Sequence, residues 1–529
     1  MVRQEIVKLI KEAAKKAGFS ALAAVHIDYP EDEKHGDYAT NFALQTAKTI
    51  RLTPKAIANN LRSHILNLEP ALFEKIEIAD PGFLNFFISK QYLYKQVGEI
   101  LRQKEFFGKL KTGQGKKISI ESVSANPTGQ LHIGNGRNAF SGDVLSNVLE
   151  KAGYKVVREY FVNDAKNSKQ IIELGKTALG KGETYKTVRI VSLLEKNKIT
   201  GQTESEAGWQ LAQIIQNNNK DFLEKKLKVK FDKWVSEEEA IYQQNKINKM
   251  LDWLKKNNLV YEKEGALWIK TSQFGDDKDW VVVRETGEPT YLLSDIAYHK
   301  DKFDRGFDKV IDIWGADHQA HVSKIKAASK MLGFKGSLDI LVLQLVTLRG
   351  GEKMSKRLGN VITLEELVDE IGLDVARWFY LQKSLNTHTE IDLDLAKEQS
   401  EKNPVYYVQY AHARICSILS KSGKSPAFAK ASAGKENLKL LNQPAELALI
   451  KQLIRLPETV EDTARDYQVQ RLPQYATDLA TSFHQFYRDC QVLSDDKNLS
   501  KARLALVLAT KIILKNTLSL MGISATEKM

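Results

Sequence analysis

A strand, a glycine-rich loop, a helix and a second strand follow one another between residues 117 and 162. This order constrains the fold more than any other feature of the chain. Residues 117–123 alternate polar and apolar side chains, the stretch before residue 152 has helical spacing, and Gly153 suits the left-handed position that ends a helix. Residues 154–162 are expected to form the next strand. Such units pack side by side into parallel sheets, so the sequence predicts an α/β domain here.

The two ends of the chain have patterns of their own. Helical spacing over residues 2–17 and an aromatic-rich strand at residues 83–88 predict a small α+β unit spanning residues 1–110. Residues 395–529 show helical periodicity. It is interrupted at residues 421–435, which are rich in Lys, Ala, Ser and Gly and are expected to form an exposed linker.

The α/β domain is expected to span residues 111–394. A lysine- and asparagine-rich stretch at about 166–275 is interpreted as an insertion, because apolar strands resume at residues 310–314 and 340–346. We therefore predict a multidomain fold with an α+β N-terminal domain, a Rossmann-type α/β domain carrying an insertion, and an all-α C-terminal domain.

Composition excludes several classes of protein. The longest apolar runs, such as residues 504–509, fall far short of the roughly 18 residues that cross a membrane. The two cysteines, Cys416 and Cys490, lie far apart, which excludes a disulfide framework and a thiolate zinc site and favours the cytoplasm. No structural metal is predicted. The net charge of +12 over 529 residues indicates a polyanionic partner.

The loop at residues 124–137 lies between a strand and a helix, where α/β folds bind nucleotides. Backbone N–H groups at the start of a helix favour phosphate, and Gly134 and Gly136 permit a close approach. Residues 134–139 also fit a GxGxxA dinucleotide fingerprint, in which Glu159 could hold a ribose. A third interpretation is that the glycines serve only tight packing between strand and helix. The loop by itself does not separate these alternatives.

A second glycine-flanked loop follows the strand at residues 340–346. It reads Gly350-Gly351-Glu352-Lys353-Met354-Ser355-Lys356-Arg357. Two lysines three residues apart can neutralise the negative charge that spreads onto a leaving pyrophosphate. The alternative is a solvated, lysine-rich surface loop.

The two loops together resemble the paired motifs of class I aminoacyl-tRNA synthetases, His-Ile-Gly-His and Lys-Met-Ser-Lys-Ser, which lie on the two halves of a split Rossmann fold. Further tracts resemble the arginyl-tRNA synthetase family in particular, and they are residues 35–41, 81–86, 124–137, 274–279, 289–291, 295–299, 314–318 and 403–414. The chain departs from the motifs at two positions. Asn135 stands in place of the second histidine, and Arg357 in place of the final serine.

The resemblance implies roles for individual residues. The family's arginine pocket, carried over to this chain, comprises Glu121, Tyr291 and Asp295 near the guanidinium and Ser124, Asn126 and Asp317 near the α-amino group. The implied catalytic residues are His132, Asn135, Lys353 and Lys356. The implied ATP-binding residues are Ala125, Asn126, Pro127, Thr128, Gly129, Gln130, Leu131, His132, Ile133, Gly134, Asn135, Lys353, Met354, Ser355 and Lys356.

The residue types of this pocket suit a guanidinium on elementary chemical grounds. A guanidinium needs carboxylates placed for paired hydrogen bonds. Tyr291 and Asp295 are four residues apart and would share one face of a helix. Without the resemblance, Asp295 would be interpreted as a surface carboxylate and Tyr291 as a core aromatic residue.

The C-terminal domain carries an expected RNA-binding face. Tyr407, Tyr410 and Arg414 have the spacing of one helical face, and aromatic rings with a guanidinium suit unstacked bases. The same spacing is also common in buried cores, and the resemblance favours the RNA interpretation. In the N-terminal unit, Asn85 and Phe87 match the part of the family that contacts tRNA.

The resemblance therefore implies a monomeric arginine–tRNA ligase of the cytoplasm. Its substrates are arginine, ATP with Mg²⁺, and tRNA; it forms an arginyl-adenylate intermediate, and it requires tRNA before it activates arginine. A dinucleotide-dependent oxidoreductase is one rival, and it leaves the lysine loop and the helical C-terminus unexplained. A catalytically silent RNA-binding relative is the other.

Overall fold

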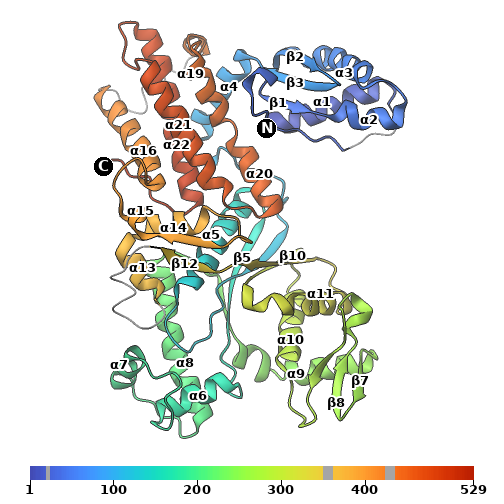
Figure 1. The fold of residues 1–529 in the computed structure, drawn as a ribbon, viewed down its shortest axis with the longest axis vertical. Coiled ribbons are helices and arrows are strands. Elements are labelled where there is room, and N and C mark those ends of the chain that lie inside the picture. The colour runs from blue at the N-terminus through green and yellow to red at the C-terminus, as the bar shows by residue number, and fades with distance from the viewer. Residues whose placement is uncertain (20–23, 350–361, 423–434) are drawn as a thin grey trace.

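The computed structural model describes residues 1–19, 24–349, 362–422 and 435–529. Figure 1 shows the N-terminal domain in blue beside the long C-terminal helices in red, with the α/β domain in the middle and its insertion at the far end. The predicted lysine motif at residues 353–357 lies outside the described residues, as does most of the predicted linker at residues 421–435.

An antiparallel sheet with helices packed on it forms the N-terminal domain. Its elements are α1 (Val2–Lys16), η1 (Glu33–His35), β1 (Tyr38–Thr40), α2 (Phe42–Ile50), α3 (Pro54–Leu68), β2 (Phe73–Ala79) and β3 (Phe83–Ile88). The sheet has the order β1–β3–β2, and the expected strand at residues 83–88 is confirmed as its centre. The expected first helix is confirmed as α1, whose Ile6 and Ile10 are fully buried. Helices α4 (Lys90–Gln103) and η2 (Lys104–Phe106) lead to the next domain.

A parallel sheet forms the centre of the α/β domain. From edge to edge its strands are β11 (Ser337–Leu343), β10 (Lys309–Gly315), β4 (Lys117–Glu121), β5 (Lys155–Val162) and β6 (Lys233–Ser236). The expected strand–helix–strand order is confirmed, because α5 (Ile133–Lys151) joins β4 to β5 and is followed by Gly153 with a left-handed φ of 95°. Strand β6 comes from within the segment interpreted as an insertion. Its four residues are too few to give a recognisable alternation.

The rest of the expected insertion forms two lobes, which Figure 1 shows on either side of the lower end of the molecule. One lobe consists of α6 (Lys169–Ala178), α7 (Val188–Lys196), α8 (Glu204–Asp221) and η3 (Phe222–Lys226). The other contains η4 (Glu238–Tyr242), α9 (Lys246–Lys256), η5 (Thr271–Phe274) and an antiparallel sheet of β7 (Val260–Lys263), β8 (Ala266–Ile269) and β9 (Trp280–Val283). The chain then returns to the central sheet through α10 (Tyr291–Asp304), and η6 (Ala316–His321) and α11 (Val322–Met331) follow β10.

Helices dominate the described chain after the central sheet, as the periodicity predicts. Two short strands, β12 (Val346–Arg349) and β13 (Thr389–Asp392), pair in parallel. Helices α13 (Leu364–Ile371) and α14 (Leu373–Leu381) lie between them in the sequence. The C-terminal helices are α15 (Leu393–Lys397), α16 (Pro404–Lys421), α18 (Lys435–Leu438), α19 (Pro444–Leu453), α20 (Leu456–Asp466), α21 (Arg471–Asp489) and α22 (Lys497–Leu520). Asn403 caps α16 by accepting from the N–H of Val405 at 3.1 Å.

Helix α20 fixes the N-terminal domain to the C-terminal helices. Its Glu458 is fully buried and accepts hydrogen bonds from the backbone N–H of Arg3 at 2.9 Å and from the hydroxyls of Tyr29 and Tyr38. The Arg3 guanidinium in turn pairs with Asp462 at 2.7 Å. The first and last domains of the chain are therefore packed as one unit.

Candidate active site

A cleft of about 760 Å³ opens at the carboxyl ends of β4, β5 and β10. Ligands bind at this edge of the sheet in open α/β folds. Most residues predicted for arginine and ATP line the cleft, and they are Glu121, Ser124, Ala125, Asn126, Thr128, Gly129, Gln130, Leu131, His132, Ile133, Gly134, Asn135, Asp295 and Asp317. Pro127 and Tyr291 are outside this lining.

The first predicted motif forms the N-terminus of α5. His132 accepts the N–H of Gly134 at Nδ1 (3.0 Å), and the side-chain oxygen of Asn135 accepts the N–H of His132 (3.0 Å). These bonds satisfy N–H groups that the start of a helix leaves unpaired. Burial lowers the pKa of His132, and the charge of Asp317 only partly opposes it. The ring is therefore neutral near neutral pH, and its proton lies on Nε2 because Nδ1 is an acceptor.

Gly136 serves packing, which was one of the three interpretations of the loop. A Cβ atom there would lie 2.7 Å from the side chain of Leu364 and 2.8 Å from the ring of Tyr380. The Tyr380 hydroxyl donates to the carbonyl of Ile133 at 2.7 Å, so this contact also anchors the first turn of α5. Gly134 has a different neighbour, since a Cβ atom there would lie 2.8 Å from the His132 ring.

A strained turn carries the chain from β4 into the cleft. Val123 and Ser124 have left-handed φ values of 69° and 41°, which disfavour residues with a side chain. The Ser124 hydroxyl donates to the Glu121 carboxylate at 2.8 Å and accepts the backbone N–H of Phe161 at 3.1 Å. These bonds hold the turn that presents residues 124–126 to the cleft.

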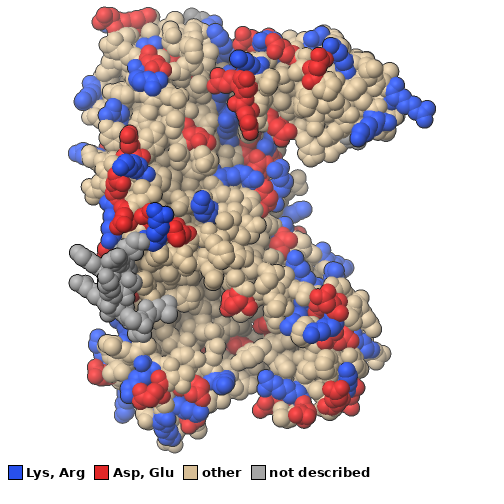
Figure 2. All heavy atoms as spheres, viewed as in Figure 1, with Lys and Arg blue, Asp and Glu red and all other residues tan. Residues whose placement is uncertain are grey.

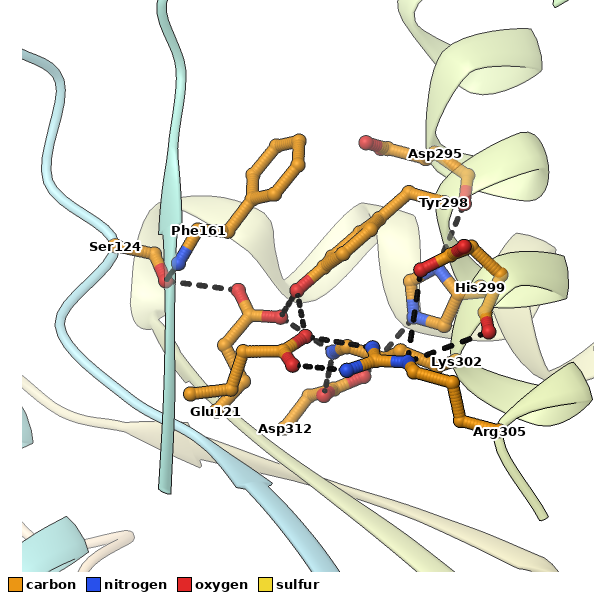
Figure 3. Close-up of polar contacts among 11 residues, drawn as sticks. Glu121, Ser124, Phe161, Asp295, Tyr298, His299, Lys302, Arg305 and Asp312 are labelled. Atoms are coloured by element: carbon orange, nitrogen blue, oxygen red, sulfur yellow. Dashed lines mark hydrogen bonds and ion pairs between the residues drawn. The ribbon is translucent and has the colours of Figure 1, made fainter. Parts of the chain in front are cut away.

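Helix α10 meets the strand ends through buried charged groups, which Figure 3 shows in close-up. Lys302 is fully buried, and its ammonium contacts the carboxylates of Glu121 and Asp312, the latter at 2.7 Å. His299 Nε2 lies 2.9 Å from Asp312. Burial disfavours a charge on His299, but the bond to Asp312 outweighs this and raises its pKa. Each buried carboxylate at the floor of the cleft is thus paired with a basic side chain.

Glu159 belongs to the same network. It is fully buried, pairs with Arg305 and accepts the Tyr298 hydroxyl at 2.6 Å. Burial alone would raise the pKa of Glu159, but the ion pair with Arg305 lowers it. A carboxylate held in this way cannot bind a ribose, and the dinucleotide interpretation is rejected.

Asp295 reaches the cleft from the first half of α10. Its Oδ2 lies 2.7 Å from Nε2 of His321, and its side chain is 35% exposed. Tyr291, one helical turn earlier, is 59% exposed. The predicted helix is present, but Asp295 lines the cleft and Tyr291 does not.

Glu237 is an acidic residue beside Asp295 that the sequence analysis missed. It follows β6 and is only 6% exposed. Burial raises its pKa to about 8, and the charges of Asp295 and Asp164 add to the rise. Asp164 is itself buried and accepts the hydroxyl of Ser236 at 2.7 Å. The feature of the sequence that could have identified Glu237 is its position directly after a strand of the central sheet. This feature can be used only if β6 is recognised as a strand.

The second predicted motif, with Lys353, Met354, Ser355 and Lys356, lies outside the described residues. The described chain on either side of it borders the first motif. Before it, β12 contributes Val346 to the lining of the cleft. After it, the carbonyl of Ile362 accepts the N–H of Ile133 at 3.3 Å, and the N–H of Leu364 donates to Leu131 at 2.8 Å.

Aromatic side chains from two helices meet on the predicted RNA-binding face. The Arg414 guanidinium lies 4.9 Å from the ring centre of Tyr410 and 5.0 Å from that of Tyr487. The ring of His484 lies 5.0 Å from that of Tyr407. His484 lies on α21 and Tyr407 on α16, so this contact is not visible in the spacing of the sequence.

The two predicted residues of the N-terminal domain differ in accessibility. Asn85 is 4% exposed within β3. Phe87 is half-buried, and the Lys75 ammonium lies 4.2 Å from its ring centre. Of the two, Phe87 is the more accessible to a ligand.

The surface gives less information than the cleft. Figure 2 shows acidic and basic side chains interspersed over one face, so the positive excess is not gathered into one patch there. Among the described residues, no group of three or more His, Cys, Asp or Glu side chains could hold a metal ion. No helix in this part of the chain is long and apolar enough to cross a membrane.

Three family models together match nearly the whole chain. Residues 4–88 match the arginyl tRNA synthetase N terminal domain, residues 96–172 and 176–411 the catalytic domain of class I (R) tRNA synthetases, and residues 408–529 the DALR anticodon binding domain. The chain is 41% identical over 551 residues to an arginine–tRNA ligase of Carboxydothermus hydrogenoformans, covering 99% of this chain and 98% of the relative. It is 42% identical over 550 residues to one from Bacillus subtilis, covering 98% of each. The arginyl-tRNA synthetase structure of Thermus thermophilus has the same fold, with a TM-score of 0.79, 22% identity and 100% of both chains covered.

Proposed function

This chain belongs to the arginyl-tRNA synthetase family of class I arginine–tRNA ligases, and we propose that arginine and ATP react in the cleft at the carboxyl ends of β4, β5 and β10. One observation carries the proposal. The N-terminus of a long helix, which favours phosphate, and the carboxylates of Glu121 and Asp295, which favour a guanidinium, border the same cleft. The family expected from the sequence, its fold class and its ligase activity are confirmed.

We propose that the guanidinium of arginine binds against Asp295, with Glu237 as a second acidic partner. Asp295 lines the cleft, and its charge contributes to the raised pKa of Glu237. Burial, and then the charges of Asp295 and Asp164, keep Glu237 protonated, and a guanidinium at Asp295 would offset the repulsive part. Tyr291 and Glu121 remain proposed neighbours of the side chain. Ser124, Asn126 and Asp317 are proposed for the α-amino end, which points the carboxylate of arginine toward α5.

ATP is proposed to bind along residues 125–135. The neutral ring of His132 would donate from Nε2 to a phosphate oxygen. The side-chain oxygen of Asn135 accepts the backbone N–H of His132, so its amide N–H₂ group remains to donate to a phosphate oxygen. Lys353 and Lys356 are proposed to neutralise the β- and γ-phosphates together with Met354 and Ser355 of their loop. This role is supported by the flanking chain at Val346 and Ile362, which borders the first motif.

The two-step reaction that the family resemblance implies is proposed for this arrangement. A carboxylate oxygen of arginine attacks the α-phosphorus of ATP, the bond to the bridging oxygen breaks, and pyrophosphate leaves with the electron pair. The terminal ribose hydroxyl of tRNA then attacks the arginyl carbonyl, loses its proton and displaces AMP. Residues of the chain act by positioning and by stabilising charge rather than by forming a covalent bond. We propose that Mg²⁺ arrives with ATP and shields the charge of its phosphates.

The tRNA is proposed to contact both ends of the chain. Tyr407, Tyr410 and Arg414 form an aromatic and cationic face suited to unstacked bases. Phe87 and Asn85 are the proposed contacts in the N-terminal domain. We further propose that the functional units are residues 1–110, 111–394 and 395–529, and that the enzyme acts as a monomer in the cytoplasm.

Charging assays test this function directly. Total tRNA is incubated with the enzyme, ATP and each proteinogenic amino acid in turn, and acid-precipitable aminoacyl-tRNA is measured. Arginine alone is expected to be attached. Attachment of another amino acid at a comparable rate would contradict the proposed pocket.

A further inference from the structure

Helix α10 has a second task besides carrying Asp295. Its next turns direct Tyr298, His299 and Lys302 at the ends of the central strands, as Figure 3 shows. Lys302 has no exposed surface, although lysine is rarely buried. Its ammonium contacts Glu121 of β4 and Asp312 of β10. The proposed reaction makes no use of this buried cation.

Glu121 in turn holds the strained turn of the cleft. Its Oε1 accepts the hydroxyl of Ser124 at 2.8 Å, while its Oε2 accepts from Lys302 and from the Tyr298 hydroxyl at 2.8 Å. Ser124 and its neighbour Val123 have left-handed backbones that their surroundings must enforce. The chain of contacts therefore runs from Lys302 through Glu121 to Ser124.

We propose that Lys302 is a positioning residue for arginine: it fixes the Glu121 carboxylate, which fixes the turn that presents Ser124 and Asn126 to the substrate. This inference rests on the proposed placement of arginine in the cleft. The Tyr298 hydroxyl cannot replace Lys302, because its single proton is shared between Glu121 at 2.8 Å and Glu159 at 2.6 Å.

Charge compensation is the competing explanation for Lys302. Glu159 has its own cation in Arg305, and Asp312 has a second partner in His299. Glu121 receives its ionic contact from Lys302. Removing Lys302 together with Asp312 leaves the net charge of the network unchanged but also leaves Glu121 without that contact. This pair of substitutions separates charge balance from positioning.

The phosphate end of the cleft is held by other contacts. The first turn of α5 is fixed by the bonds between His132 and Asn135 and by the Tyr380 hydroxyl on Ile133. These contacts do not involve Glu121. Loss of the Lys302 contact should therefore weaken the binding of arginine and spare that of ATP.

The experiment compares Lys302→Met/Asp312→Asn with the wild type in ATP–pyrophosphate exchange with tRNA present. Lys300→Met/Asp304→Asn is the matched control, because it removes an ion pair from the exposed side of the same helix. We expect the arginine KM of the test variant to rise about 10- to 100-fold and the ATP KM to change by less than about threefold. The test variant should still unfold cooperatively, but at a lower temperature because the buried Glu121 loses its ionic contact. The control should match the wild type throughout.

The Asp295→Asn variant in the same assay distinguishes a failure of the Lys302 proposal from a failure of the proposed arginine site. If it raises the arginine KM while Lys302→Met/Asp312→Asn leaves it unchanged, the positioning role of Lys302 is wrong and the arginine site stands. If neither variant changes the arginine KM, the proposed site itself is wrong. Equal rises in the arginine and ATP KM values, or a test variant that does not fold, would show that Lys302 serves the general structure and would overturn the proposal.

Discussion

The proposed role of Glu237 predicts that arginine binding depends on pH. Its pKa is raised to about 8 by burial and then by the charges of Asp295 and Asp164. Near pH 7 only about one tenth of the molecules therefore carry the ionised form, and near pH 6 about one hundredth. A guanidinium beside Glu237 favours the ionised form, so arginine binding must release a proton below about pH 8.

The size of the effect follows from these fractions. If arginine binds the ionised form, its KM falls about tenfold for each pH unit between roughly pH 6 and pH 8, then levels off. Glu237→Gln keeps the shape of the side chain and removes the titration. Its KM is expected to be high and nearly independent of pH over this range, while ATP binding is unchanged.

Two measurements check this reasoning. The arginine KM is measured from pH 6 to pH 8.5 in tRNA charging for the wild type and for Glu237→Gln. Calorimetry of arginine binding in two buffers of different ionisation enthalpy counts the released protons. His321 also faces Asp295, so the comparison with Glu237→Gln is needed. An identical pH profile in the variant, or the absence of proton release in the wild type, would refute the role of Glu237.

Two further predictions rest on contacts described above, and a third rests on the family resemblance. The folded state binds the Glu237 proton more tightly than the unfolded state, so the wild type loses stability as pH rises from about 4.5 to about 8. The Glu237→Gln variant lacks this loss and should unfold at a higher temperature than the wild type near pH 8.5. A lower unfolding temperature for the variant would contradict the raised pKa. The Glu458→Ala variant leaves the Tyr29 and Tyr38 hydroxyls without their carboxylate, which should cost about 1–3 kcal/mol of stability. It should also weaken tRNA binding and leave the arginine KM unchanged. A tRNA affinity equal to that of the wild type would show that the docking of the first domain does not contribute to tRNA binding. The resemblance to synthetases that need tRNA predicts that ATP–pyrophosphate exchange is near background without tRNA and appears when it is added, and robust exchange in RNA-free enzyme would oppose it.

The predicted elements came from local patterns, and the structure confirms those with clear periodicity. The first helix, the strand at residues 83–88 and the strand–helix–strand unit all rest on the alternation or spacing of several residues. Strand β6 has four residues, lies between Asp232 and Glu237, and is too short for a local pattern to mark it. Because β6 was missed, Glu237 at its carboxyl end was missed too.

The site required tertiary information for the same reason. Lys302 reads as a surface lysine in the sequence, and only the packing of α10 on the sheet shows that it is buried. His321 and Asp295 are far apart in the chain, and His484 meets Tyr407 across two helices. Motif spacing identified the loop at residues 124–137, but the separate tasks of Gly134 and Gly136 depend on their neighbours in space.

The central claim is that arginine binds in this cleft with its guanidinium against Asp295. The most direct test is the arginine KM of Asp295→Asn in tRNA charging, with the ATP KM and the thermal unfolding curve measured alongside. Loss of one charged partner of a guanidinium should cost about 2–4 kcal/mol, or roughly 30- to 1,000-fold in the arginine KM. We expect that rise with a nearly unchanged ATP KM and an intact fold. An arginine KM equal to that of the wild type would contradict the account and place the arginine site elsewhere in the molecule.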